Sequence, residues 1–201
     1  MQGYTDSMNR LAEAFGRLPG IGQKTAERLT YYVLRATREE MSDFAHAILD
    51  VKNTVAHCSR CHNITESDPC PICADSRRDS DVICVVEEPK DLFAIEAAGD
   101  YRGVYHVLMG RIAPLDGVGP EALTIASLVE RVRSATAKEV IIATNPNLEG
   151  DGTAMAIAKA LEGLHVRVTR LARGLPTGSA IEYANASILS DALAGRTTVS
   201  Q

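Results

Sequence analysis

Four of the five cysteines lie within sixteen residues, in the segment CSRCHNITESDPCPIC at 58–73. They form two C-x-x-C pairs, Cys58 with Cys61 and Cys70 with Cys73, which are separated by eight residues. Each pair can place two thiolates on one metal ion, and two pairs complete a tetrahedron with no open position. The spacing therefore predicts a structural zinc site that holds together a segment without a hydrophobic core. A redox dithiol pair and an iron–sulfur cluster use the same residue types and are the alternatives.

A proline and two glycines precede a helical pattern in LPGIGQKTAERL, residues 18–29. A glycine turn that leads into a helix tolerates left-handed backbone angles and exposes several N–H groups to one point. Gly20 and Gly22 therefore predict an anion site, with phosphate as the expected ligand. Lys24 and Arg28, one helical turn apart, would flank that phosphate. The string resembles the helix-hairpin-helix motif, which implies contact with the DNA backbone without sequence readout. A plain turn between two helices is the alternative.

A third group of polar side chains follows two of the predicted strands. Its members are, in chain order, Glu87, Glu88, Asn145, Asn147, Glu149 and Asp151. Functional groups gather at the carboxyl ends of parallel strands, so these side chains are expected to share one edge of the sheet. An acidic cluster at such an edge can bind Mg²⁺ for phosphoryl chemistry.

The segments ICVVEEPKDLFAIE and IIATNPNLEGDGTAMAIAK are similar to the Toprim domain of primases, topoisomerases and some nucleases. That resemblance implies a glutamate after the first strand and an Asp-x-Asp motif after a later one. Glu87 occupies the first position, whereas Asn145 and Asn147 stand where the aspartates would be. The two neutral amides weaken any Mg²⁺ site and argue against metal-dependent catalysis.

These residues must be positioned by a chain of 201 residues with 45% hydrophobic and 23% charged side chains, which is typical of globular proteins. Tryptophan is absent and aromatics make up only 4%, so the core is expected to be aliphatic. The net charge of −5 argues against a broad DNA-binding surface, and any DNA contact should be local. No apolar run approaches a membrane span and no signal-peptide pattern is present, so the expected compartment is the cytoplasm.

The pattern of apolar residues predicts an α/β fold. Residues 5–57 are helical by periodicity, whereas from residue 80 short apolar runs alternate with helical stretches. Strands are predicted at 81–88, 103–110, 139–145 and 165–172, and helices at 90–99, 120–135, 153–164 and 179–196. This alternation is typical of right-handed parallel crossovers. The predicted domains are a helix-hairpin-helix region at 1–57, a zinc module at 58–73, a parallel-sheet Toprim domain at 80–174 and a C-terminal tail at 175–201.

The order of these motifs resembles the RecR family of bacterial recombination mediators over nearly the full length of the chain. The resemblance implies a protein that is not an enzyme, binds DNA through the hairpin, and forms a ring-like homo-oligomer, a tetramer or a dimer. It also implies that the protein acts in the cytoplasm, at the nucleoid, where it helps the RecO and RecF proteins to load recombinase onto single-stranded or gapped DNA. The Toprim edge, Glu87 with residues 145–151, would engage a partner protein. A metal-dependent Toprim phosphoryl-transfer enzyme, a nuclease or a primase-like protein, is the alternative.

Overall fold

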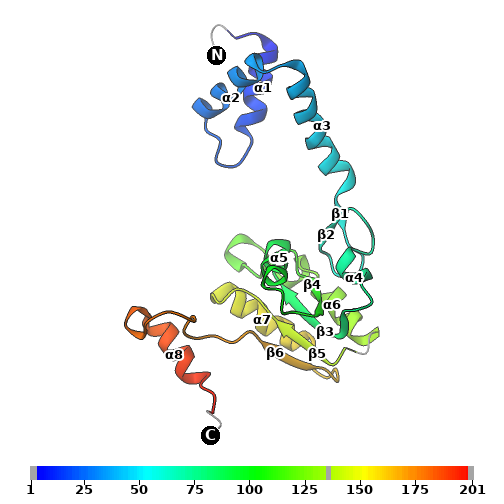
Figure 1. Ribbon diagram of the computed structural model, residues 1–201, viewed down its shortest axis with the longest axis vertical. Coiled ribbons are helices and arrows are strands. Elements are labelled where there is room, and N and C mark those ends of the chain that lie inside the picture. The colour runs from blue at the N-terminus through cyan, green and yellow to red at the C-terminus, as the bar shows by residue number, and fades with distance from the viewer. Residues whose placement is uncertain (1–3, 135–136, 199–201) are drawn as a thin grey trace. The chain divides into compact units, whose positions relative to one another are not determined.

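The computed structural model describes residues 4–134 and 137–198, and the chain divides into two compact units between Val55 and Ala56 (Figure 1). The first unit contains α1 (Asp6–Gly16), α2 (Gln23–Arg35) and α3 (Arg38–Thr54). Ala12 and Ala26 are both buried, and their small side chains let α1 and α2 pack closely. A capping box between Thr37 and Glu40 starts α3 by satisfying its first backbone N–H groups.

The second unit begins with the zinc module. Its β1 (Ala56–His57) and β2 (Ile64–Thr65) pair antiparallel, and α4 (Pro71–Ala74) is a single turn that follows them. This segment has few apolar side chains of its own, and its buried residues include three of the four clustered cysteines. The module therefore depends on the cysteine cluster and on the sheet beside it for its stability.

The sheet has four parallel strands in the order β4-β3-β5-β6 (Figure 1). They are β3 (Asp79–Val86), β4 (Gly103–Val107), β5 (Glu139–Ile142) and β6 (Arg167–Arg170). The connecting helices are α5 (Pro89–Ala98), α6 (Ile125–Ser134) and α7 (Leu148–Ala160). Successive residues of β3 face opposite sides, so Ile83 packs in the cluster with α6 and α7, and Cys84 packs in the cluster with α5. The parallel α/β architecture with an N-terminal helical region confirms the predicted fold class.

The core is largely aliphatic, as expected, but its largest fully buried side chain is aromatic. Tyr105 on β4 is fully buried, and its hydroxyl donates a 2.6 Å hydrogen bond to Glu96 on α5. Arg78 also donates to the Glu96 carboxylate and to the Gly103 carbonyl. The buried ring is therefore tolerated because its polar end has a partner.

Several predicted boundaries differ from the structure. The helix predicted at 120–135 begins at Ile125, because Pro120 starts a separate 3₁₀ turn (Pro120–Ala122) that ends at the extended Leu123. The predicted end of this helix, residue 135, lies outside the described residues. The helix predicted at 153–164 begins earlier, at Leu148, because Asn147 caps it. The tail, predicted as one helix, contains a 3₁₀ turn (Ile181–Tyr183) and then α8 (Ala186–Ala194). A further 3₁₀ turn lies at Pro114–Asp116.

Candidate zinc centre and nucleic-acid interface

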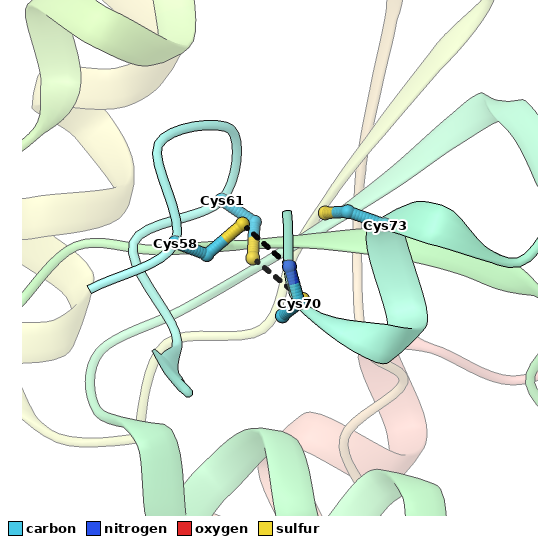
Figure 2. A group of neighbouring side chains, drawn as sticks. All are labelled: Cys58, Cys61, Cys70 and Cys73. Atoms are coloured by element: carbon cyan, nitrogen blue, oxygen red, sulfur yellow. Dashed lines mark hydrogen bonds between the residues drawn. The ribbon is translucent and has the colours of Figure 1, made fainter. Parts of the chain in front are cut away.

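The four clustered cysteines converge on one point in the second unit (Figure 2). Their sulfur atoms all lie within 4.8 Å of one another, and the Sγ atoms of Cys61 and Cys70 are 3.6 Å apart. Tetrahedral zinc with Zn–S bonds of about 2.3 Å requires sulfur–sulfur distances of about 3.8 Å, so the cluster has the size of a four-thiolate zinc site. Within 4–134 and 137–198, these residues are the one group of three or more His, Cys, Asp or Glu side chains able to hold a metal.

The backbone around the cluster already favours thiolate at one ligand. Burial acts to raise the pKa of Cys58, but N–H groups of Cys70, Cys61 and Arg60 outweigh it and lower that pKa to about 7. The Cys70 N–H lies 3.3 Å from the Cys58 sulfur (Figure 2). Burial raises the pKa of Cys70 to about 11, helped by the neighbouring Cys61 thiol. A bound dication would favour the thiolate form that burial disfavours at Cys70.

The zinc module is anchored to the sheet by backbone hydrogen bonds. The Val107 N–H at the end of β4 donates to the Cys61 carbonyl over 2.8 Å. The Arg131 guanidinium on α6 donates to the Tyr105 carbonyl at 2.6 Å and to the Arg60 carbonyl at 3.3 Å. Arg131 thus joins the strand and the metal-binding loop, a role that the sequence did not reveal because no motif spacing links these residues.

Two histidines complete the same junction. The His62 and His106 rings meet edge to face with centroids 5.2 Å apart, and His62 Nε2 lies 2.8 Å from the Ser127 hydroxyl. His106 is fully buried, and its Nε2 is 3.1 Å from the Thr124 carbonyl, so that nitrogen carries the proton and donates. Burial, together with the charge of Arg131, lowers the pKa of His106 to about 3. His106 is therefore a neutral structural residue.

The predicted hairpin lies between α1 and α2. Gly20 has a φ of +77°, which favours glycine, and the Ile21 N–H closes the turn onto the Leu18 carbonyl at 3.1 Å. Gly22 differs from the expectation, because its φ of −81° is extended and needs no glycine. Gly22 is the N-cap of α2 and offers no side-chain acceptor. The Thr25 N–H donates to the Gly22 carbonyl at 3.0 Å, so the N–H groups of Gln23 and Lys24 at the helix start are the ones that can face an outside ligand.

The two predicted basic residues of the hairpin are exposed. Lys24 lies in the first turn of α2 and Arg28 one turn later. In the part of the chain that the structure describes, neither side chain has a salt bridge. Both charges are therefore available to a phosphate ligand near the helix start.

At the carboxyl edge of the sheet, Glu87 is held by the residue that replaces an expected aspartate. Glu87 is only 2% exposed. Its two carboxylate oxygens accept hydrogen bonds from the Asn145 backbone N–H at 2.8 Å and from the Asn145 side-chain amide at 2.6 Å. Gly150 permits this approach, because a Cβ there would lie 2.0 Å from the Asn145 carbonyl oxygen. Asn145 is thus the hydrogen-bond donor to both oxygens of the buried Glu87 carboxylate.

Two other predicted site residues cap helices. The Asn147 side chain accepts a 2.8 Å hydrogen bond from the Gly150 N–H and starts α7. Glu88 forms a capping box with Asp91 at the start of α5, and its carboxylate lies 2.6 Å from the Lys90 ammonium. Both positions therefore have a structural role at the start of a helix.

The remaining acids of this edge are paired with arginines. Glu149 forms an ion pair with Arg111. Asp151 accepts from Arg173 and, at 2.6 Å, from Arg170, and these hydrogen bonds lower the pKa of Asp151 to about 2. The structure therefore brings Glu87 to Asn145 but does not gather Glu87, Glu149 and Asp151 into one carboxylate cluster.

Comparison with known proteins assigns these three regions to one family. Residues 8–52 match the RecR helix-hairpin-helix model, residues 55–75 the RecR four-cysteine zinc finger model, and residues 81–172 the Toprim domain model. The chain is 49% identical over 196 residues to recombination protein RecR of Rhodopirellula baltica, covering 98% of each chain. It is 57% identical over 187 residues to recombination protein RecR of Chloroflexus aggregans, covering 93% of this chain and 91% of that one. The chain belongs to the RecR family.

Membership of the RecR family identifies the cysteine cluster. The four sulfurs lie in the segment that matches the RecR four-cysteine zinc finger, and their separation fits zinc. The predicted structural zinc site at Cys58, Cys61, Cys70 and Cys73 is therefore supported by both sequence and geometry. The four-strand sheet is a Toprim domain, as its resemblance implied. Among the described residues, no helix is long and apolar enough to cross a bilayer.

Proposed function

We propose that this RecR-family chain is a DNA-binding, non-catalytic mediator of recombinational repair. It acts at the nucleoid in the cytoplasm with RecO and RecF and helps to load recombinase onto single-stranded or gapped DNA. Its relatives are named recombination proteins, and its first 55 residues include a match to the RecR helix-hairpin-helix. The observation that carries the proposal is the Gly20–Gly22 turn with exposed Lys24 and Arg28 on the helix that follows.

The hairpin suits backbone binding without sequence readout. The uncapped first turn of α2 offers N–H donors, and Lys24 and Arg28 offer positive charge beside them. Residues 1–57 contain seven basic and seven acidic residues, so attraction to DNA must come from this local arrangement. A single hairpin would bind weakly, because it neutralises few phosphates.

A homo-oligomer, a dimer or a tetramer, would supply the missing affinity through several hairpins acting together. The exposed face of α3 supports self-association. Phe44, Ile48 and Val51 follow one another at helical spacing and are 52%, 52% and 59% exposed. A second copy that covers this stripe would bury it. Ile48→Asp is expected to lower the molar mass measured by light scattering, whereas Asp50→Asn on the same helix should not.

The Toprim edge supports a role in partner binding without chemistry of its own. Phosphoryl transfer needs two or more carboxylates around Mg²⁺. Here Glu87 is hydrogen bonded to Asn145, Glu149 is paired with Arg111, and Asp151 is paired with arginines. We therefore propose that this edge, with its alternating acids and arginines, contacts RecO or RecF.

The test is a titration of gapped and single-stranded DNA with wild type, Lys24→Ala and Lys159→Ala over a range of salt. Lys159 is an exposed lysine on α7 and serves as the matched control for loss of one charge. Lys24→Ala should weaken binding and reduce the salt slope by about one ion, whereas Lys159→Ala should leave both unchanged. Equal behaviour of the two variants would refute the hairpin as the DNA site.

The same reactions, run with Mg²⁺ and with RecO, test the rest of the proposal. Intact DNA and a stronger complex in the presence of RecO are expected. New DNA products that disappear in Glu87→Ala would overturn the non-catalytic assignment and favour a Toprim phosphoryl-transfer enzyme.

A further inference from the structure

The second helix of the hairpin, α2, carries more than the two predicted basic residues. Four residues of α2 are spaced by four, three and four positions and lie on one face of the helix: Lys24, Arg28, Tyr31 and Arg35. We call this face the basic stripe of α2. These residues line an open groove of about 520 Å³, which Glu27 and Tyr32 also line. Lys24 and Arg35 are separated by about 16 Å along the helix axis, at 1.5 Å per residue.

The tyrosine at the middle of this stripe is available to a ligand. Tyr31 is 45% exposed and follows Arg28 on the same face. The Tyr4 ring packs against it edge to face, with centroids 5.6 Å apart, and limits its freedom. The one acidic member of the groove, Glu27, accepts a 3.1 Å hydrogen bond from Gln23. The stripe is therefore a basic track interrupted by a partly fixed aromatic ring.

We propose that Tyr31 is a stacking platform for an unpaired base of single-stranded DNA whose phosphates are held by Lys24 and Arg28. An aromatic ring within a basic groove is the arrangement that binds single strands, because every base has a face that can stack. Bases in a duplex are already stacked and paired, so they cannot reach the ring. Arg35 would contact the strand beyond the stacked base.

A second copy of the chain is a poorer occupant for this stripe. A two-fold interface brings the same patch of each copy together, so Lys24, Arg28 and Arg35 would face identical cations. Charge complementarity instead favours a polyanion. The inference rests on the proposed DNA-binding function. It adds a preference for single-stranded DNA, which it assigns to Tyr31.

The experiment compares single-stranded and duplex oligonucleotides of equal length by fluorescence anisotropy. Tyr31→Leu is expected to weaken single-strand binding by about five- to a hundredfold and to leave duplex binding unchanged. Tyr31→Phe keeps the ring and should bind both DNAs as the wild type does. Tyr183→Leu removes another surface tyrosine, 83% exposed in the second unit, and should have no effect. A 2-aminopurine base in the single strand should be quenched by wild type and Tyr31→Phe, but not by Tyr31→Leu.

Three results would overturn the platform. Single-strand binding by Tyr31→Leu at wild-type strength would remove the role of the ring. Equal losses on both DNAs would make Tyr31 a support for the hairpin. A lower molar mass of Tyr31→Leu in light scattering would assign the stripe to contact between copies. Failure of the proposed function looks different, because Lys24→Ala would then match wild type on both DNAs.

Discussion

The hairpin unit and the Toprim unit use charged side chains in opposite ways. In the Toprim unit the acids of the predicted partner-binding or Mg²⁺ site are each engaged within the protein: Glu87 by the Asn145 amide, Glu149 by Arg111, and Asp151 by Arg170. On α2 of the hairpin unit, the cations stand in an open groove with no salt bridge in the described part of the chain. Charges that are paired internally stabilise a fold, whereas exposed charges cost it little and can bind a ligand. Polar substitutions in the Toprim unit should therefore change stability, and those on α2 should change binding.

The largest effect is expected from loss of a zinc ligand. Cys58→Ser leaves three thiolates for the metal, and structural zinc contributes on the order of 10 kcal/mol in small domains. We expect loss of bound zinc and a lower melting temperature of the second unit. Zinc content by atomic emission and melting by calorimetry measure both. Cys84→Ala, which removes a buried thiol outside the cluster, should retain zinc, and equal zinc loss in both variants would contradict the assignment.

The next largest effect is expected where the first turn of α7 approaches Asn145 and Glu87 at the Toprim edge. A Cβ at position 150 would lie 2.0 Å from the Asn145 carbonyl oxygen and 2.9 Å from the Glu87 carboxylate. Gly150→Ala should therefore force the backbone apart and lower the free energy of unfolding by about 3 kcal/mol or more. Gly152→Ala is the control on the same helix, since no atom lies within 4 Å of its added Cβ. Alanine there should stabilise by about 0.5–1 kcal/mol, and urea denaturation measures both changes.

A smaller loss is expected when the missing Toprim aspartate is restored. Asn145→Asp replaces a donor with a second carboxylate 2.6 Å from the buried Glu87, and two carboxylates so close cannot both ionise. We expect a loss of about 2–4 kcal/mol near neutral pH, partly recovered by added Mg²⁺. Asn147→Asp is the matched control, because aspartate caps a helix as well as asparagine does. Unchanged stability of Asn145→Asp would mean that the amide is not the needed donor.

A smaller change in the free energy of unfolding is expected when the pH falls from about 7 to about 5, and in the second unit it should depend on His106. Burial lowers its pKa to about 3, well below the usual 6.5, so the unfolded chain binds a proton first as pH falls. The stability from neutral His106 is fully present above about pH 6.5 and declines below it, by up to about 1.4 kcal/mol per pH unit. Denaturation between about pH 7 and 5 should show a shallower slope for His106→Gln than for wild type. His57→Gln, an exposed histidine on β1, should leave the slope unchanged.

What could be predicted from sequence depended on how far apart along the chain the interacting residues lie. The cysteines and the hairpin were found because their chemistry depends on close spacing along the chain. The alternation of strands and helices indicated the parallel sheet, although the cap at Asn147 moved the start of α7 to Leu148. Contacts between distant segments left no such pattern: His62 with His106, Arg131 with Arg60, and Arg111 with Glu149. Sequence located the Toprim acids, but only the structure showed that each already has a partner.

The smallest change in stability is expected on α2, and it completes the contrast. Lys24→Ala and Arg28→Ala remove exposed charges without a salt bridge among the described residues, and alanine favours the helix. Their free energies of unfolding should stay within about 0.5 kcal/mol of wild type, while DNA affinity falls. Urea denaturation and DNA titration of the same preparations separate the two effects. A destabilised Lys24→Ala would mean that the hairpin cations serve the fold after all, as the acids of the Toprim edge do, and the loss of DNA binding would then no longer report a phosphate contact.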